Sequence, residues 1–187
     1  MSLILFSHSN EKHLSDWECD EKLLITSPPS IELLNYPKTD QQVVAIGGGS
    51  VIDSAKIISK RMVIAVPTTY SGASRTSHAV LWDHKNHRKV DVETVKPETL
   101  IVKEYFEKCD TRILQDSYCD CQAHLIESAI SKKANAQSVA IVNQAQKLGH
   151  NGTLTGLINM SLLAGDAIEI TGTNILHSLS YPLTLEY

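Results

Sequence analysis

The stretch from residue 42 to residue 67 constrains the fold of this chain more than any other. An apolar run, "QVVAIGG" (42–48), leads into three consecutive glycines, and a second apolar run, "MVIAVP" (62–67), follows. The segment between them, "SVIDSAKIISKR" (50–61), repeats its apolar residues at helical spacing. Near-continuous apolar strands joined by a helix are typical of parallel strands with a crossover helix. We therefore expect a parallel α/β sheet.

The rest of the chain divides into a part with short strands and a part with helices. Three more apolar runs predict strands at residues 22–27, 77–83 and 99–103. After about residue 106 the periodicity becomes helical and predicts helices at 116–133, 135–149 and 154–183, the last broken near Gly172 and limited by Pro182. Asp116 or Ser117 is the expected N-cap of the first of these helices. We predict an α/β domain over residues 1–106 and an all-helical domain over 107–187.

Charge and composition exclude several classes of protein. The net charge is −4 and no run of Lys or Arg exceeds two residues, which disfavours nucleic acid and anionic membranes as partners. No apolar run approaches the roughly 18 residues of a membrane span, and the start lacks a signal-peptide pattern. The four cysteines show no disulfide spacing. We expect a cytoplasmic protein with reduced thiols.

The glycine turn is the first candidate binding site. Gly47, Gly48 and Gly49 allow a ligand close to the backbone, and the following helix N-terminus suits a phosphate. Ser50 is expected to cap this helix or to donate its hydroxyl to the phosphate. The spacing is neither the Rossmann nor the P-loop pattern, so a ligand-free tight turn is the alternative. A second small-residue loop, "VPTTYSGAS" (66–74), follows the next strand, and two such loops together favour a nucleotide site.

The second candidate site is "DCQAHLIES" (120–128), in which Asp120, His124 and Glu127 share one helix face. These three side chains are compatible with a metal site, with an acid–base pair or with a solvated helix surface. His177 lies in an apolar helix, where a hydrogen-bonded core histidine is the ordinary interpretation. Cys119 and Cys121 point about 100° away from Asp120 on the helix, and no second C-x-x-C motif accompanies them, which disfavours structural zinc.

Five segments together resemble the iron-containing (group III) alcohol dehydrogenase family. They are "GGGSVIDSAK" (47–56), "PTT" (67–69), "DCQAHLIES" (120–128), "LLAGDAI" (162–168) and "HSLSYPLT" (177–184). The last is most similar to the branch that includes phosphonoacetaldehyde reductases. The resemblance implies a dehydroquinate synthase-like fold, with an NAD(P)-binding α/β domain and a helical domain that holds one divalent metal.

The resemblance also assigns residues and a reaction. The implied cofactor-binding residues are Gly47, Gly48, Gly49, Ser50, Asp53, Thr68, Thr69 and Lys89, with Asp53 near the nicotinamide and Lys89 at a ribose hydroxyl. The implied metal ligands are Asp120, His124 and His177, three of the family's four ligands to Fe²⁺ or, in some members, Zn²⁺. The implied reaction is hydride transfer between NAD(P) and a small alcohol or aldehyde, phosphonate-bearing in the nearest branch, with the metal as Lewis acid. Glu127 has no ligand role in this scheme and is expected either to support a ligand from outside the ligand set or to pack the helix.

The sequence departs from the family pattern in three ways. The fourth ligand of the family would lie beyond Tyr187, so we expect a shortened or fragmentary member. The opening region is compressed into residues 27–40, and Ser27 stands where many members have an acidic residue, which predicts that NADP is accepted as well as NAD. Arg75 replaces a usual acidic residue and either meets an anion or is solvated.

A shortened helical domain has a consequence for assembly. It is expected to expose Ile158, Leu162, Leu163 and Leu176 and so to lead to a homodimer or to poor solubility. Two further hypotheses stay open: a non-catalytic remnant of the family, and an enzyme of the glycerol-1-phosphate dehydrogenase or dehydroquinate synthase branch.

Overall fold

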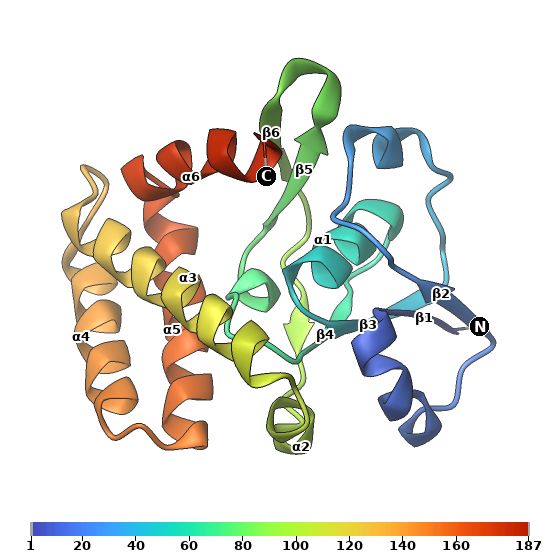
Figure 1. The fold of residues 1–187 in the computed structure, drawn as a ribbon, viewed down its shortest axis with the longest axis horizontal. Helices are drawn as coiled ribbons and strands as arrows, with labels where there is room; N and C mark the ends of the chain where they lie inside the picture. Colours follow the sequence, from blue (N-terminus) through green and yellow to red (C-terminus); the bar gives the residue numbers. More distant parts are fainter. Residues whose placement is uncertain (1, 187) are drawn as a thin grey trace.

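The structure is a computed structural model, and it describes the backbone of residues 2–186 and the side chains of residues 2–180. A five-stranded sheet lies on one side of the molecule and a group of four helices on the other, with a two-stranded hairpin between them (Figure 1). The elements, in chain order, are β1 (Ser2–Phe6), η1 (His8–Asp16), β2 (Glu21–Leu24), η2 (Ile31–Asn35), β3 (Gln42–Gly47), α1 (Gly49–Ile58), β4 (Ile64–Pro67), η3 (Ala73–Arg75), β5 (His78–Asp83), η4 (His84–Asn86), β6 (Arg88–Glu93), β7 (Glu98–Thr99), α2 (Lys103–Glu107), α3 (Thr111–Ile130), α4 (Ala136–His150), α5 (Leu154–Thr171) and α6 (Ile175–Glu186).

The sheet is parallel throughout, in the order β2-β1-β3-β4-β7, so the predicted parallel α/β fold is confirmed. Both faces of its central strands are buried, which explains their continuous apolar runs. On one face Leu5 and Ala45 pack against Ile52 of α1, and on the other Ile4 and Ile46 pack in the cluster of Leu14 and Tyr105. The chain leaves β1 to one side for β2 and returns to the other side for β3. The topological switch point therefore lies between β1 and β3, where sheets of this order bind ligands.

The opening of the chain differs from the expectation. The first strand is β1 at residues 2–6, and the segment predicted as a strand at 22–27 is the second strand, β2, at the outer edge of the sheet. The two strands form a parallel pair joined by η1, so the opening is not compressed into residues 27–40. Ser27 consequently follows the edge strand, and Ser7 is the residue that follows the first strand. The run "SLILF" was overlooked because it is short and stands at the very start.

The middle of the chain contains a hairpin that the apolar runs did not reveal. β5 pairs antiparallel with β6 and forms a separate two-stranded sheet. β6 reads "RKVDVE" and is half exposed, so it lacks the apolar signal of a core strand. The strand predicted at 99–103 is also shorter than expected, because β7 spans only Glu98–Thr99 and α2 begins at Lys103.

The helical half follows the predicted pattern with shifted boundaries. α3 starts at Thr111 because the Asp110 side chain caps it by accepting hydrogen bonds from two backbone N–H groups, so the predicted N-cap at Asp116 or Ser117 is wrong. α4 is capped by Asn135 and Ser138 and agrees with its predicted range. The break near Gly172 is confirmed by a positive φ of 69°. α6 runs through Pro182 to Glu186, so Pro182 does not limit it.

The two halves are joined where α5 crosses the loop around η3. Gly165 of α5 lies so close to this loop that a Cβ at that position would stand 2.7 Å from the Gly72 carbonyl oxygen. Asp166 accepts a two-pronged ion pair from Arg75, with a shortest distance of 2.8 Å, and a further bond from Lys96 at 3.0 Å. Arg75 therefore neither lies solvated nor waits for an anion. It is engaged in holding α5 against the η3 loop, which lies beside the sheet.

Three of the four apolar residues expected at the surface are wholly or partly buried. Ile158 is buried at 3% exposure, and Leu162 and Leu163 are partly buried against the helical core. Leu176 is exposed at 39%. Three of the four residues therefore give no reason to expect a homodimer, because α3 and α4 already cover α5. Over residues 2–186, no helix combines the length and the apolar character that a bilayer crossing requires.

Candidate functional site

The three predicted metal ligands converge from two helices. Asp120 and His124 project from α3 and His177 from α6, and one ligand atom of each lies within 4.8 Å of the others. The Nε2 atom of His177 lies 3.4 Å from Asp120 Oδ1, and the Nε2 atom of His124 lies 3.9 Å from the same oxygen. The two imidazole rings stack with centroids 4.8 Å apart and an interplanar angle of 5°. Two nitrogens and one carboxylate oxygen thus surround a common point.

The environment of each histidine sets its charge. Burial lowers the pKa of His124, and the Asp120 carboxylate opposes this shift without cancelling it. Burial also disfavours the charged form of His177, but hydrogen bonds and charge from Asp120 and Glu127 outweigh it and raise the pKa of His177. His124 is therefore held neutral with its ring available as a ligand. Its Nδ1 atom is buried and has no hydrogen-bond partner among the described residues.

Glu127 contacts His177 from the far side of the cluster. Its carboxylate is fully buried, and its Oε2 lies 2.6 Å from the Nδ1 of His177. Its Oε1 accepts a hydrogen bond of 3.1 Å from the backbone N–H of the same residue. This pairing joins α3 to the first turn of α6. Sequence spacing placed Glu127 on the same face as Asp120 and His124, but it gave no sign of the partner on α6.

The glycine turn and the "PTT" loop lie side by side at the carboxyl ends of β3 and β4. A Cβ on Gly48 would stand 3.2 Å from the Thr69 hydroxyl, and the Thr68 N–H donates to the Gly47 carbonyl. Gly48 occupies the N-cap position of α1, so Ser50 does not cap the helix; it stands exposed in the first turn. The predicted neighbourhood of these two loops is therefore present in the fold. Their contacts with a nucleotide stay predictions.

A third polar loop at this edge of the sheet was overlooked. "SHSN" (7–10) follows β1, and its Ser7 hydroxyl bonds Ser9 and Asn10. Because β1 and β3 are neighbouring parallel strands that flank the switch point, this loop and the glycine turn lie at the same edge of the sheet. The available signal was the one used for the other two loops, an apolar run followed by small polar residues.

Two further predicted cofactor residues have partners within the protein. Asp53 accepts from the Val80 N–H at 3.1 Å and from the buried Lys56 amine at 3.2 Å, and so ties α1 to β5. The Nζ of Lys89 on β6 lies 4.7 Å from the ring centroid of Trp82. Burial lowers the pKa of Lys89 and the Asp120 carboxylate opposes that shift, which places Lys89 within electrostatic reach of the metal-ligand cluster. Its predicted contact with a ribose stays a prediction.

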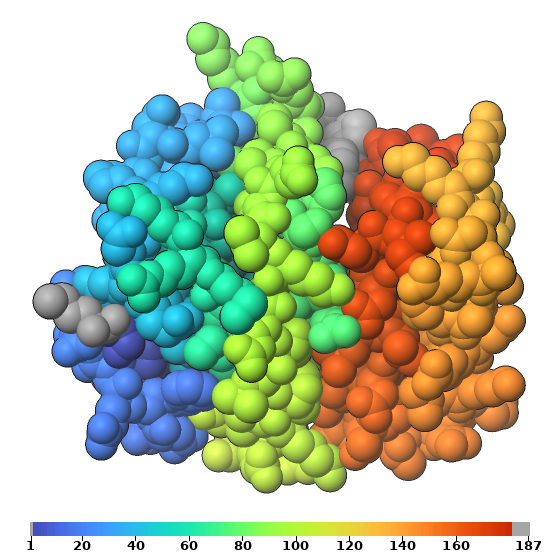
Figure 2. Space-filling model, turned by 180° about the vertical axis from the view of Figure 1, so that it is seen from behind, coloured from blue at the N-terminus to red at the C-terminus, as the bar shows by residue number. Residues whose placement is uncertain are grey.

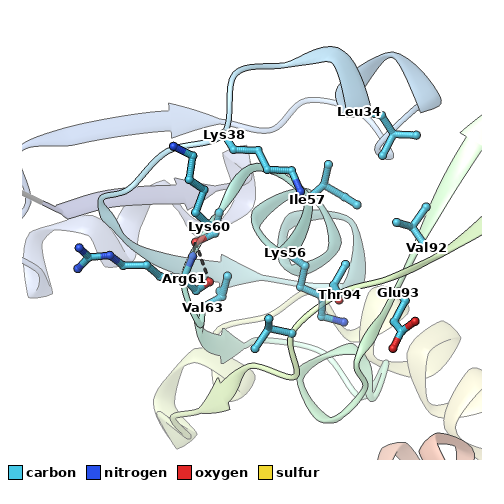
Figure 3. Close-up of a pocket in the computed structure, with 12 residues that line it drawn as sticks. Leu34, Lys38, Lys56, Ile57, Lys60, Arg61, Val63, Val92, Glu93 and Thr94 are labelled. Carbon is cyan, nitrogen blue, oxygen red and sulfur yellow. Dashed lines mark hydrogen bonds between the residues drawn. The ribbon is translucent and has the colours of Figure 1, made fainter.

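A basic pocket elsewhere on the surface does not serve as the site. It has a volume of about 420 Å³ and lies between α1, η2 and β6 (Figure 3). Two of its four cations are already engaged: Lys60 pairs with Asp40 at 2.9 Å, and the Lys56 amine bonds Asp53, Thr76 and the His78 carbonyl. The pocket also adjoins the C-terminal end of α1, opposite to the glycine turn.

The cysteines do not contribute to the cluster. Cys121 is fully buried in the helical core, where burial raises the pKa of its thiol to about 12, and Cys119 is exposed. A thiol with so high a pKa is not a thiolate ligand at neutral pH. Asp120, His124 and His177 are the described His, Cys, Asp and Glu side chains that gather closely enough to hold an ion.

Comparison with known proteins gives a consistent result. The sequence profile of iron-containing alcohol dehydrogenases matches residues 32–104. The 4-hydroxybutyrate dehydrogenase of Clostridium kluyveri is 26% identical, over 85% of this chain and 54% of that protein. The phosphonoacetaldehyde reductase of Streptomyces viridochromogenes is 27% identical, over 76% of this chain and 47% of that protein. The iron-containing alcohol dehydrogenase structure from Corynebacterium glutamicum superposes with a TM-score of 0.84 at 19% identity, over all of this chain and 60% of that one.

The fold, a parallel sheet with a glycine turn joined to a helical bundle, is that of these dehydrogenases. In sequence and in fold the chain is therefore similar to the iron-containing alcohol dehydrogenase family. It spans about half the length of the curated relatives it matches.

Proposed function

We propose that this chain binds one divalent metal ion and NAD(P) and interconverts a small alcohol with its aldehyde or ketone. The observation that carries the proposal is the convergence of Asp120, His124 and His177 from two helices. A set of two imidazole nitrogens and one carboxylate oxygen suits Fe²⁺ or Zn²⁺. The neutral state of His124 supports the same conclusion, because a ligand histidine binds without its proton.

The glycine turn fits the pyrophosphate of a dinucleotide. Gly49 begins α1, so the free N–H groups of that helix point to the space beside the turn. A Cβ added at Gly49 would meet nothing closer than the Ser71 hydroxyl at 3.6 Å, so the approach to this backbone is open. Thr68 and Thr69 border the same space from the next loop. The residues present therefore fit the cofactor.

When bound, the metal supplies Lewis acidity toward a carbonyl oxygen and the reduced nicotinamide supplies a hydride. With both groups held by the chain, an aldehyde would be reduced to its alcohol, with the hydride taken from the cofactor and one proton taken from solvent. The chain's own residues hold the ion, orient the ring of His177 and fix the glycine turn. The names of two relatives include carboxylate and phosphonate compounds, and Lys89 places a cation near Asp120. We therefore propose a short anionic aldehyde as substrate.

The direct test is an assay of NAD(P)H oxidation by the anaerobically iron-loaded protein with short aldehydes. Aldehydes that carry a carboxylate or a phosphonate are expected to react faster than neutral aldehydes of equal length. Activity that is lost on chelation and restored by Fe²⁺ or Zn²⁺ supports the proposal. Equal background oxidation in the loaded and chelated protein would reject it.

Replacing Gly49 with aspartate is expected to weaken NAD(P)H binding at least tenfold, a loss of about 1.4 kcal/mol. The carboxylate would occupy the phosphate space, whereas α1 itself should tolerate an acidic residue in its first turn. Fluorescence titration with NADH and NADPH measures the effect. Gln137→Asp places the same charge in the first turn of α4 and should leave binding unchanged. Equal affinity in Gly49→Asp and the native chain would show that the cofactor lies elsewhere.

The loop after β1 is expected to decide between NADP and NAD. "SHSN" (7–10) contains no carboxylate, so nothing in it repels a 2′-phosphate, and we expect both cofactors to bind. Ser7→Asp should lower the affinity for NADPH about fivefold more than that for NADH, because it places like charges together. Ser27→Asp, after the edge strand, is the matched control and should change neither affinity. An unchanged NADPH:NADH ratio in Ser7→Asp would contradict this assignment.

A further inference from the structure

The carboxylate of Glu127 is buried and makes two hydrogen bonds with one residue of α6. It is 0% exposed, and both of its oxygens bond His177, one at the backbone N–H and one at the ring. The N–H of His177 lies in the first turn of α6, where backbone donors lack a partner within the helix. Glu127 therefore supplies from α3 the acceptor that the start of α6 needs, at the end of the helix dipole that favours a negative charge.

The same carboxylate determines which ring nitrogen carries the proton. Glu127 accepts the backbone N–H of His177 at one oxygen and contacts the ring at the other, and a glutamate is ordinarily ionised at neutral pH. An ionised carboxylate only accepts hydrogen bonds, so the 2.6 Å contact requires a proton on Nδ1 of His177. In the neutral ring this leaves the lone pair on Nε2. That nitrogen is the one that lies 3.4 Å from Asp120.

His124 has no comparable support. Its Nδ1 is buried without a hydrogen-bond partner among the described residues, and it lies beside Gly72, which has no side chain. The ring is held by packing and by its position on α3. In a histidine that binds a metal through one ring nitrogen, the other ring nitrogen usually makes a hydrogen bond. That bond fixes the tautomer and the orientation of the ring. In this cluster Glu127 provides that bond to His177.

We propose that Glu127 is a positioning residue that keeps His177 in the Nδ1–H tautomer and aims its Nε2 at the point shared with Asp120 and His124. This inference rests on the proposed metal-binding function, which it extends to a residue outside the ligand set. Holding the start of α6 in place would be a structural role only. A substitution that keeps this contact but changes the hydrogen bond to the ring separates it from the positioning role.

Glu127→Gln separates the two roles. A glutamine can still accept from the His177 N–H through Oε1, so the anchor of α6 is retained. Its amide NH₂ can only donate to the ring, which makes Nδ1 the acceptor and moves the proton to Nε2. We expect the affinity for Zn²⁺ or Co²⁺ in chelator competition to fall 10- to 100-fold, while the unfolding temperature of the metal-free protein changes little. Glu127→Asp keeps a carboxylate, which only accepts hydrogen bonds, on a shorter side chain. Its metal affinity should lie between that of the native chain and that of Glu127→Gln.

The matched control is Glu169→Gln. Glu169 also accepts from a backbone N–H, that of Ser77 on the loop before β5, and its variant should keep the native metal affinity within about twofold. Native affinity in Glu127→Gln would overturn the positioning role. So would equal losses in Glu127→Gln and Glu169→Gln, which would indicate general destabilisation.

A second readout does not depend on metal. Nitrogen NMR of the ring of His177 in the metal-free protein, at a pH where the ring is neutral, should show Nδ1–H in the native chain and Nε2–H in Glu127→Gln. The same tautomer in both proteins would overturn the inference. If the native chain binds no metal but the tautomer changes as expected, the positioning of His177 stands and the proposed function fails.

Discussion

Replacing His124 with alanine is expected to lower the affinity for Zn²⁺ or Co²⁺ at least 100-fold. Loss of a partner outside the ligand set already costs 10- to 100-fold, and His124 is one of the three side chains at the cluster itself. In the native chain, metal at 100 times its dissociation constant should stabilise the fold by about 2.7 kcal/mol. That corresponds to a rise of roughly 5–10 °C in unfolding temperature for a chain of this size. The variant should show no such rise.

His150→Ala is the matched control for this experiment. His150 ends α4 on the exposed surface, and its loss removes an imidazole from the same helical half without touching the cluster. The control should keep the native thermal shift. A shift that survives in His124→Ala but disappears in His150→Ala would place the ion on α4 instead.

The second large effect is expected at the joint between the halves. Asp166→Asn should lower the free energy of unfolding by about 2 kcal/mol, because it removes one of the two acceptor oxygens and leaves Arg75 and Lys96 without their carboxylate charge. The pair is partly exposed, so the loss should be smaller than for a fully buried ion pair. Urea unfolding at pH 7 measures the loss. Asp116→Asn changes an exposed carboxylate on α3 and should alter stability by less than about 0.5 kcal/mol.

The effect of Asp166→Asn should depend on pH in one direction. Burial acts to raise the pKa of Asp166, but the hydrogen bonds from Arg75 and Lys96 prevail and lower it below its ordinary value of about 4. A lowered carboxyl pKa gives stability that is fully present above the unfolded-state pKa and is lost as the pH falls through the folded-state pKa. The difference between the native chain and the variant should therefore be constant above about pH 5 and shrink at lower pH. A difference that grows on acidification would contradict this account.

Local sequence signals predicted the parts of the site that lie close together along the chain. The glycines at 47–49 and the "PTT" loop follow two strands that pair directly, so their neighbourhood followed from the parallel sheet alone. Asp120 and His124 share a helix face because residues four apart do so on any helix. The predicted α4 was nearly correct because its capping residues, Asn135 and Ser138, lie in the sequence beside it.

Contacts between residues that lie far apart in the sequence were not predictable in this way. The partner of Glu127 lies 50 residues away, and its identity depends on how α6 meets α3. Arg75 has its carboxylate 91 residues away on α5, so its sequence neighbours could not distinguish an ion pair from a solvated side chain. The misplacement of the first strand had a different cause. A five-residue apolar run at the start was not counted as a strand, and the assignment of Ser27 followed from that omission.

The arrangement in space shows why these distant contacts matter. Viewed from the back, residues of the hairpin and the following segment fill the middle of the molecule between the sheet and the helices (Figure 2). The ion pairs of Asp166 and the hydrogen bond from Ser77 to Glu169 join α5 to this middle part of the molecule. The position of α5 therefore depends on contacts that no single segment encodes.

The central claim is that Asp120, His124 and His177 hold one divalent ion. Metal analysis of the anaerobically purified chain, with iron and zinc supplied during expression, tests it most directly when His124→Ala is analysed beside it. The account predicts close to one iron or zinc ion per native chain and nearly none in the variant. No bound metal in the native chain, even after anaerobic loading, or the same content in both proteins, would contradict it.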